Sequence, residues 1–216
     1  MKQLKTKVFN IASKWHTDQV RKYTGNPYTD HLVSVSEIVE DRGGDPNQVM
    51  AALLHDTLED TDATEDNIIN DLIDAGFSEV DSKDITKMVI DLTDVYTHES
   101  FPNKNRKERK SLEANRLGKV SERSKFIKCA DLIDNGYDIV ENDPSFAKTY
   151  LKEKLLTLLE MSTIDEEMPS LDGEGDISIW ASAYLNAIEG SMSIMSDAQY
   201  QKMWKDIKDM LGRDIK

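Results

Sequence analysis

The stretch VMAALLHDTLED, residues 49–60, decides the fold class. Its first six residues are apolar, so a helix formed by them is apolar on all sides and belongs at the centre of a helical domain. Asp45 and Pro46 precede this stretch, and an N-cap residue followed by proline is a frequent helix start. We therefore predict a buried central helix that begins near residue 46 and continues to residue 60, where its end is acidic.

Helical periodicity continues on both sides of this stretch. Apolar residues at the 3.6-residue period predict an amphipathic helix near residues 4–21 and a second one from about Thr29 to Arg42. No alternating strand pattern of useful length is present, so we predict an all-α protein. Further helices are expected near residues 64–75, 81–94, 103–120, 122–140, 144–162, 177–192 and 197–212, with a polar loop over 163–176.

Composition excludes several classes of protein. The 216 residues, 38% hydrophobic and 31% charged, are enough for a buried core and too apolar for disorder. No apolar run approaches the roughly 18 residues that cross a bilayer, and no secretion signal is visible, so we expect a cytoplasmic protein. The net charge of −14 argues against non-specific binding to nucleic acid. Cys129 is the only cysteine, which excludes an intrachain disulfide, and we expect it to be buried.

Two histidines and two aspartates form a candidate metal site: His31, His55, Asp56 and Asp131. Imidazole nitrogen and carboxylate oxygen suit a hard-to-borderline divalent ion such as manganese. Asp131 lies among apolar residues, and a buried carboxylate needs a partner. The alternative to a metal is a salt bridge from Asp131 to Lys128 or Arg123.

Glu59 and Asp60 are the candidate catalytic acids. On a continuous helix, Glu59 follows His55 by four residues and Asp60 follows Asp56 by four, so both acids would face the same cavity as the metal ligands. The alternative is a solvated acidic helix end. Asn135, one turn after Asp131, is expected to point into that cavity as well.

Two basic groups could hold phosphate. Arg21 and Lys22 precede the turn that leads to His31, and Arg106, Arg109 and Lys110 share one face of a predicted helix. Arginine forms bidentate contacts with phosphate, although a solvated basic helix explains the second group equally well. A structural role is expected for His16 and no role for His98.

Five segments together resemble a known family: HTDQVRK, GNPYTDH, AALLHDTLEDT, DLTD and KCADLIDN. They are similar to the HD hydrolase domain of the RelA/SpoT-type alarmone enzymes, and most of all to the free-standing, Mesh1-like small alarmone hydrolases. The resemblance covers about residues 4–140. It implies an HD-domain helical bundle, with a metal-dependent phosphohydrolase core over residues 1–162 and additional C-terminal helices over 163–216 that pack on the same domain.

The resemblance also implies roles for the candidate residues. Manganese would be bound by His31, His55, Asp56 and Asp131, and Glu59 and Asp60 would activate or position water. Arg21, Lys22, Asn135, Arg106, Arg109 and Lys110 would hold the substrate. The family reaction of the stringent response removes the 3′-pyrophosphate from ppGpp or pppGpp and leaves GDP or GTP.

Departures from the family pattern leave the base of the substrate open. Leu32 replaces the proline that usually follows the first histidine, and Gly136-Tyr137-Asp138 replaces a segment that contacts the nucleoside in the synthetase-linked enzymes. The adenine alarmone ppApp is therefore an alternative substrate. Two other hypotheses for the function are an HD phosphohydrolase acting on NADPH or another nucleotide, and an alarmone-binding, antitoxin-like protein. The sequence does not predict an oligomeric state.

Overall fold

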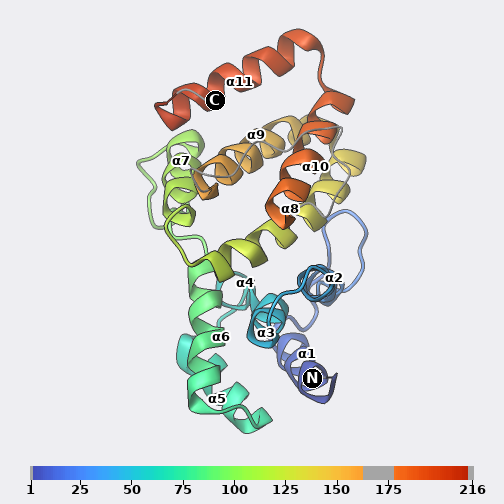
Figure 1. Ribbon diagram of the computed structural model, residues 1–216, viewed down its shortest axis with the longest axis vertical. Helices are drawn as coiled ribbons and strands as arrows, with labels where there is room; N and C mark the ends of the chain where they lie inside the picture. The colour runs from blue at the N-terminus through green and yellow to red at the C-terminus, as the bar shows by residue number, and fades with distance from the viewer. Residues whose placement is uncertain (1, 163–177, 214–216) are drawn as a thin grey trace. The chain divides into compact units, whose positions relative to one another are not determined.

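The computed structural model describes residues 2–162 and 178–213, and the regular elements in these ranges are helices (Figure 1). The predicted all-α fold is confirmed, and the predicted loop over residues 163–176 lies outside the described residues. An isolated antiparallel bridge joins Val20 and Pro27. The helices are α1 (Lys2–Trp15), α2 (Thr29–Asp41), α3 (Pro46–Leu54), α4 (Thr57–Asp60), α5 (Glu65–Ala75), α6 (Glu79–Leu92), α7 (Arg106–Leu117), α8 (Glu122–Asn142), α9 (Pro144–Met161), α10 (Ile179–Ile194) and α11 (Asp197–Leu211).

The chain forms two compact units. The first unit comprises Met1–Asp94 and Ser121–Asp131, and the second comprises Val95–Val120 and Leu132–Lys216. Helix α8 contributes its beginning to the first unit and its remainder to the second. We expected a catalytic core up to residue 162 and a C-terminal part after it. That division concerns function, which the two compact units do not test, so it stays a prediction. None of the described helices has the length and apolar composition that crossing a bilayer requires.

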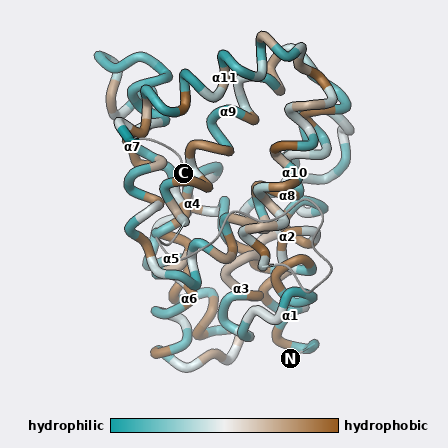
Figure 2. Tube along the Cα trace, turned by 45° about the horizontal axis from the view of Figure 1, so that its top comes forward, coloured by the Kyte–Doolittle hydropathy of each residue, from teal (hydrophilic) through white to brown (hydrophobic). Residues whose placement is uncertain are grey.

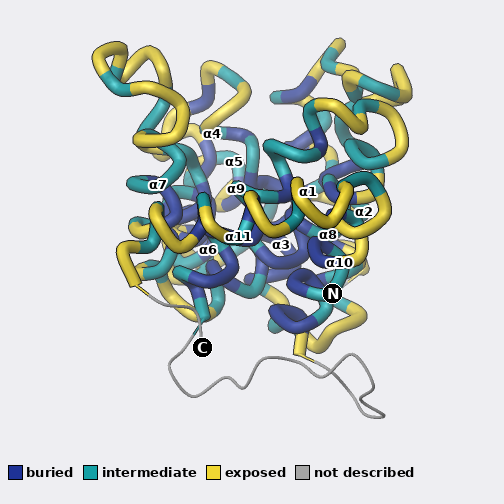
Figure 3. The backbone as a smooth tube through the Cα atoms, turned by 90° about the horizontal axis from the view of Figure 1, so that it is seen from above, coloured by how far each residue is buried: buried dark blue, intermediate teal, exposed yellow. Residues whose placement is uncertain are grey.

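Helix α3 is the centre of the first unit. Helices α1, α2 and α6 pack against it, and all of its residues from Gln48 to Leu54 are buried (Figure 3). Fully burying one aliphatic side chain stabilises a fold by roughly 1.5–3 kcal/mol. The apolar run that predicted a buried helix therefore contributes to the stability of this unit over its whole length.

Helix α9 has the same place in the second unit. It packs against α7, α10 and α11, and apolar residues recur along α9 and α10 (Figure 2). The indole nitrogen of Trp180 donates to the carbonyl oxygen of Leu158 at 2.8 Å. The helices that follow residue 178 thus complete the core of this unit around α9.

Two predicted helices end earlier than their sequence pattern suggested. The helix expected over residues 4–21 ends at Trp15, because Asp18 takes a positive φ of 65°, which no right-handed helix accommodates. The central helix ends at Leu54 rather than at residue 60, and a four-residue helix follows it. At Asp56 the backbone stays right-handed but departs from ideal helical angles, with φ −96° and ψ −2°, and regular helix begins again at Thr57.

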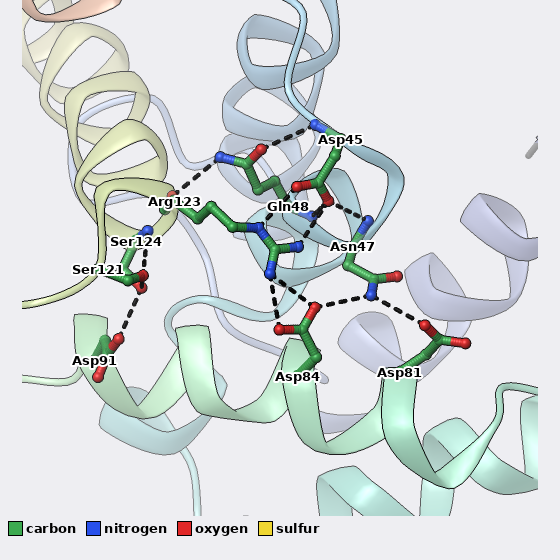
Figure 4. A network of polar contacts seen from close by, with 9 residues as sticks. All are labelled: Asp45, Asn47, Gln48, Asp81, Asp84, Asp91, Ser121, Arg123 and Ser124. Carbon is green, nitrogen blue, oxygen red and sulfur yellow. Dashed lines mark hydrogen bonds and ion pairs between the residues drawn. The ribbon is translucent and has the colours of Figure 1, made fainter.

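The start of α3 is capped as predicted and is also tied to α8. The Asp45 side chain accepts hydrogen bonds from the backbone nitrogens of Asn47 and Gln48. Its two carboxylate oxygens also accept from Arg123, at 2.7 and 2.8 Å. Arg123 reaches Asp84 of α6 at 2.8 Å in addition, so that one guanidinium joins three helices of the first unit (Figure 4).

Replacing Arg123 with methionine is expected to lower the free energy of unfolding by about 1 kcal/mol at neutral pH, the upper end for an exposed ion pair. Burial acts to raise the pKa of Asp45, but the hydrogen bonds from Arg123 outweigh it and hold the pKa below its ordinary value. Hydrogen bonds from Arg123 also lower the pKa of Asp84.

This stabilisation is present above the unfolded-state pKa of about 4 and is lost as the pH falls through the lowered folded-state values. Denaturant unfolding should therefore separate wild type from Arg123→Met at neutral pH and bring them together in strong acid. Lys83→Met, which removes only the exposed pair with Glu79, is the control. An equal effect from both variants would contradict the assignment.

Candidate functional site

The four predicted metal ligands meet in the first unit. His31 lies in the first turn of α2, His55 and Asp56 lie between α3 and α4, and Asp131 comes from α8. Ligand atoms of His31, His55 and Asp56 all lie within 4.8 Å of one another. Asp131 Oδ1 lies 3.3 Å from His31 Nε2 and 3.7 Å from His55 Nε2. Three segments that are distant in sequence therefore place two imidazoles and two carboxylates together.

The end of α3 orients His55. Its Nδ1 donates to the carbonyl oxygen of Ala52 at 2.8 Å, and a carbonyl can only accept, so in the neutral ring the lone pair is on Nε2. That Nε2 is buried, lies 3.1 Å from Asp56 Oδ2, and has no partner in hydrogen-bonding geometry among the described residues. A buried nitrogen lone pair beside carboxylate oxygens is a donor set that fits a divalent cation.

The charges at this site call for a cation. Burial disfavours the imidazolium form of His55, but the adjacent Asp56 and Asp131 outweigh burial and raise the pKa of His55 to about 9. Burial acts in the opposite sense on both aspartates, yet the pKa of each is lowered, mainly by His55 for Asp56 and by Lys128 for Asp131. The carboxylates thus stay ionised, and a bound divalent ion would supply the positive charge that otherwise favours the imidazolium form of His55.

Two further residues contact the carboxylates: Tyr28, to which the sequence assigned no role, and Lys128, which it named as an alternative partner of Asp131. The Tyr28 hydroxyl donates to Asp56 Oδ2 at 2.7 Å, and the Lys128 ammonium lies 2.8 Å from Asp131 Oδ2. The salt bridge to Lys128, the alternative for Asp131, is therefore present together with the histidine contacts. Arg123 pairs with Asp45 and Asp84 instead. The sequence could have pointed to Tyr28 through its position three residues before His31. Hydrophobic periodicity, on which the helix predictions rest, does not use such a spacing.

Glu59 and Asp60 lie on α4, and the break at Asp56 means that the continuous-helix argument for their position was wrong. What aligns them is the Asp56 carbonyl, which accepts from the backbone nitrogens of Glu59 and Asp60 at 3.1 and 2.8 Å. Glu59 Oε2 also accepts from the Asp94 backbone nitrogen at 3.0 Å. The turn therefore fixes both acids directly after the candidate ligand Asp56.

The pKa values of both acids are raised. Partial loss of hydration raises the pKa of Glu59 to about 7, and the Asp94 carboxylate adds to the rise while Lys128 opposes it. Partial loss of hydration and then Asp56 raise the pKa of Asp60. Both side chains keep exposed surface, so they combine access to water with an environment that strengthens them as bases. A wholly solvated acidic helix end does not have this property.

The first basic group lies in the loop between α1 and α2. The Arg21 backbone nitrogen donates to Asn26 at 2.8 Å and its carbonyl accepts from Gly25 at 3.0 Å, which closes a tight turn. The Lys22 ammonium lies 4.7 Å from the centre of the Tyr23 ring.

The expected structural role of His16 fits its buried position, stacked on Tyr28.

The other candidate substrate residues belong to the second unit. Arg106 forms a bidentate pair with Glu153, at 2.7 and 2.8 Å, and Arg109 donates to the carbonyl oxygen of Lys104. Lys110 follows on the same helix α7, and Asn135 lies on α8 after the unit boundary. Their expected contact with substrate stays a prediction.

His98 is exposed in the loop before α7, and Cys129 is buried as expected.

Comparison with known proteins assigns the family. Residues 9–158 match the HD domain, and the chain belongs to that family. The guanosine-3′,5′-bis(diphosphate) 3′-pyrophosphohydrolases MESH1 of Drosophila melanogaster and Xenopus tropicalis are 35% and 31% identical to it. These matches cover 60% and 62% of this chain and 66% and 69% of those proteins. A Streptomyces coelicolor GTP pyrophosphokinase is 45% identical over 26% of this chain, a segment that spans only 6% of that enzyme.

A solved structure gives the same relationship across nearly the whole chain. It is described as a metazoan ortholog of SpoT that hydrolyses ppGpp and plays a role in starvation responses. It has a TM-score of 0.56 and 25% sequence identity, over 97% of this chain and 96% of that one. The resemblance to Mesh1-like HD hydrolases that the motifs indicated is thereby confirmed.

The geometry predicts about one divalent ion per chain. His55→Ala and Asp131→Ala should each abolish its binding, measured by calorimetric titration, while circular dichroism keeps most of its helical signal. The ion should also raise the melting temperature of the wild type, because a ligand bound only by the native state stabilises it. His98→Ala is the matched control. Full ion occupancy in Asp131→Ala would remove Asp131 from the ligand set.

Proposed function

We propose that this protein is a manganese-dependent (p)ppGpp 3′-pyrophosphohydrolase. The observation that carries the proposal is the buried histidine–aspartate cluster directly followed by Glu59 and Asp60 on one turn. The names of the MESH1 relatives and the ppGpp hydrolysis by the similar solved structure support this activity. Manganese is preferred on ligand chemistry, since two imidazoles and two carboxylates suit a borderline ion.

His31, His55, Asp56 and Asp131 would hold the ion. When bound, it would polarise a phosphoryl oxygen and lower the pKa of a coordinated water. Glu59 and Asp60 would orient the attacking water and take its proton, and the raised pKa values of both acids suit that role. Water oxygen attacks the phosphorus bound to the ribose 3′-oxygen. The bond between that phosphorus and the 3′-oxygen breaks, the 3′-oxygen takes up a proton, and GDP or GTP leaves with intact pyrophosphate.

Arg21 and Lys22 would contact the phosphates from the loop before His31. We propose the same task for Arg106, Arg109 and Lys110, and contact with the nucleoside for Asn135. Arg106 would have to exchange its Glu153 pair for a phosphate. A substrate with phosphates on both sides of a ribose can form ion pairs with more of these cations than a monophosphate can. We propose the guanine alarmones as the main substrates and the adenine alarmone ppApp as a further one.

Product analysis tests the proposal. Incubated with Mn²⁺ and ppGpp, pppGpp, ppApp or NADPH, the protein is expected to release intact pyrophosphate and GDP, GTP or ADP from the alarmones. The reaction should stop on chelation of the metal. Orthophosphate from NADPH without pyrophosphate from any alarmone would instead identify a different HD phosphohydrolase. Tight alarmone binding without turnover would identify an antitoxin-like binding protein.

The acid pair separates chemistry from metal binding. Glu59→Gln and Asp60→Asn keep the shape of each side chain but remove its capacity to accept a proton. At least one of them should lower kcat by about 10²–10⁴-fold, the usual range for general acid–base catalysis, with metal content unchanged. Wild-type rates in both variants would leave these acids with no catalytic role.

Lys22→Ala tests the phosphate-binding loop. Loss of one cation that contacts substrate equally in the ground and transition states should raise KM by about 10-fold with little change in kcat. Lys83→Ala removes an exposed lysine whose described partner is Glu79 and should match the wild type in steady-state assays. Equal KM values for Lys22→Ala and wild type would exclude Lys22 from the substrate site.

A further inference from the structure

Tyr28 contacts two of the candidate metal ligands, Asp56 and His31, and also the neighbouring His16. Its hydroxyl donates to Asp56 Oδ2 at 2.7 Å. Its ring stacks on His16 with centroids 5.2 Å apart, and it meets His31 edge-on at 5.7 Å. The oxygen that accepts from Tyr28 is the same one that lies 3.1 Å from His55 Nε2 and 3.5 Å from His31 Nε2. The hydroxyl therefore sets which way the Asp56 carboxylate faces.

The loop that leads to Tyr28 also reaches α4. Gln19 Nε2 donates to the Asp60 carbonyl oxygen at 2.8 Å, so Gln19 Oε1 is the atom that lies 2.7 Å from His16 Nδ1. Because Oε1 can only accept, His16 Nδ1 donates, and His16 Nε2 is left to accept from the Thr57 hydroxyl at 3.4 Å. One continuous set of hydrogen bonds thus joins the loop to both ends of α4.

Helix α4 needs such outside contacts. It has four residues, and isolated helices of this length do not hold their conformation in water. Asp56 is its N-cap position, and the Asp56 carbonyl accepts from the backbone nitrogens of both Glu59 and Asp60. A group that fixes Asp56 therefore fixes a candidate ligand and the start of the acid-bearing turn together.

We propose that Tyr28 is a positioning residue for the metal centre and the acid pair. Its hydroxyl holds the Asp56 carboxylate toward His31 and His55, and through Asp56 it holds Glu59 and Asp60 in place. This inference rests on the proposed function, because it takes Asp56 as a metal ligand. Arg21 and Lys22 lie in the same loop, which the backbone bond from Tyr28 to Gln19 closes at 2.9 Å. The candidate phosphate-binding cations thereby lie in the same hydrogen-bonded loop as Tyr28, whose hydroxyl contacts the candidate ligand Asp56.

Tyr28→Phe is the decisive variant, because it removes one oxygen and keeps the ring on His16 and His31. Partners that orient a metal ligand are typically worth 10–100-fold in affinity, so calorimetric titration should show Mn²⁺ binding weakened by about that factor. Tyr184→Phe removes a phenol oxygen from a buried tyrosine of the second unit and should bind Mn²⁺ as the wild type does.

Kinetics at saturating Mn²⁺ give a second measurement. Tyr28→Phe should lower kcat with KM nearly unchanged, since the acid pair shifts while the cations remain. Unchanged Mn²⁺ affinity in Tyr28→Phe overturns the inference, even where the melting temperature of the metal-free protein falls. A wild type that binds no Mn²⁺ or releases no pyrophosphate overturns the proposed function itself. If the wild type is active with Mn²⁺ and Tyr28→Phe has the same Mn²⁺ affinity and the same kcat, only the proposed role of Tyr28 is overturned.

Discussion

Two ionised carboxylates held against two buried imidazoles are the constraint on which the first unit depends. Asp56 and Asp131 would repel each other without positive charge nearby, and each has a donor on its outer side, Tyr28 for one and Lys128 for the other. With His55 beside Asp56 and Lys128 beside Asp131, the carboxylates stay ionised inside the fold, where an unpaired charge is costly. Tyr28 and Lys128 thus add contacts from the protein to two of the candidate ligands, beyond any contact with a cation.

This requirement explains why the central helix stops where it does. Adjacent residues on a helix point about 100° apart, so His55 and Asp56 on an unbroken helix would diverge. The regular helix ends at Leu54, and just beyond this end Asp56 Oδ2 lies 3.1 Å from His55 Nε2. The interruption of the helical pattern therefore falls at the two adjacent candidate ligands.

The sequence predicted most of the fold and the members of the metal cluster, but not the local geometry between them. Helix starts at Pro46 and Pro144 follow from capping residues and proline, which act locally. The ends at Trp15 and Leu54 follow from the backbone conformation at Asp18 and Asp56, which hydrophobic periodicity does not predict. Tyr28 was missed as a site residue because a hydroxyl acquires its role only from the carboxylate it meets, whereas Lys128 was named beforehand as a partner of Asp131. The cations of α7 remain predictions, since the contacts described for Arg106 and Arg109 lie within the second unit.

The double use of Asp45 has a consequence for folding kinetics. Its bonds to Asn47 and Gln48 are local, whereas Arg123 is 78 residues away in sequence. Local contacts can form before the chain has closed its long loops, while distant pairs must wait for loop closure. The cap therefore belongs to the early events that start α3, and the guanidinium arrives afterwards on an existing helix end. Loss of the cap would slow folding, whereas loss of the guanidinium would chiefly speed unfolding.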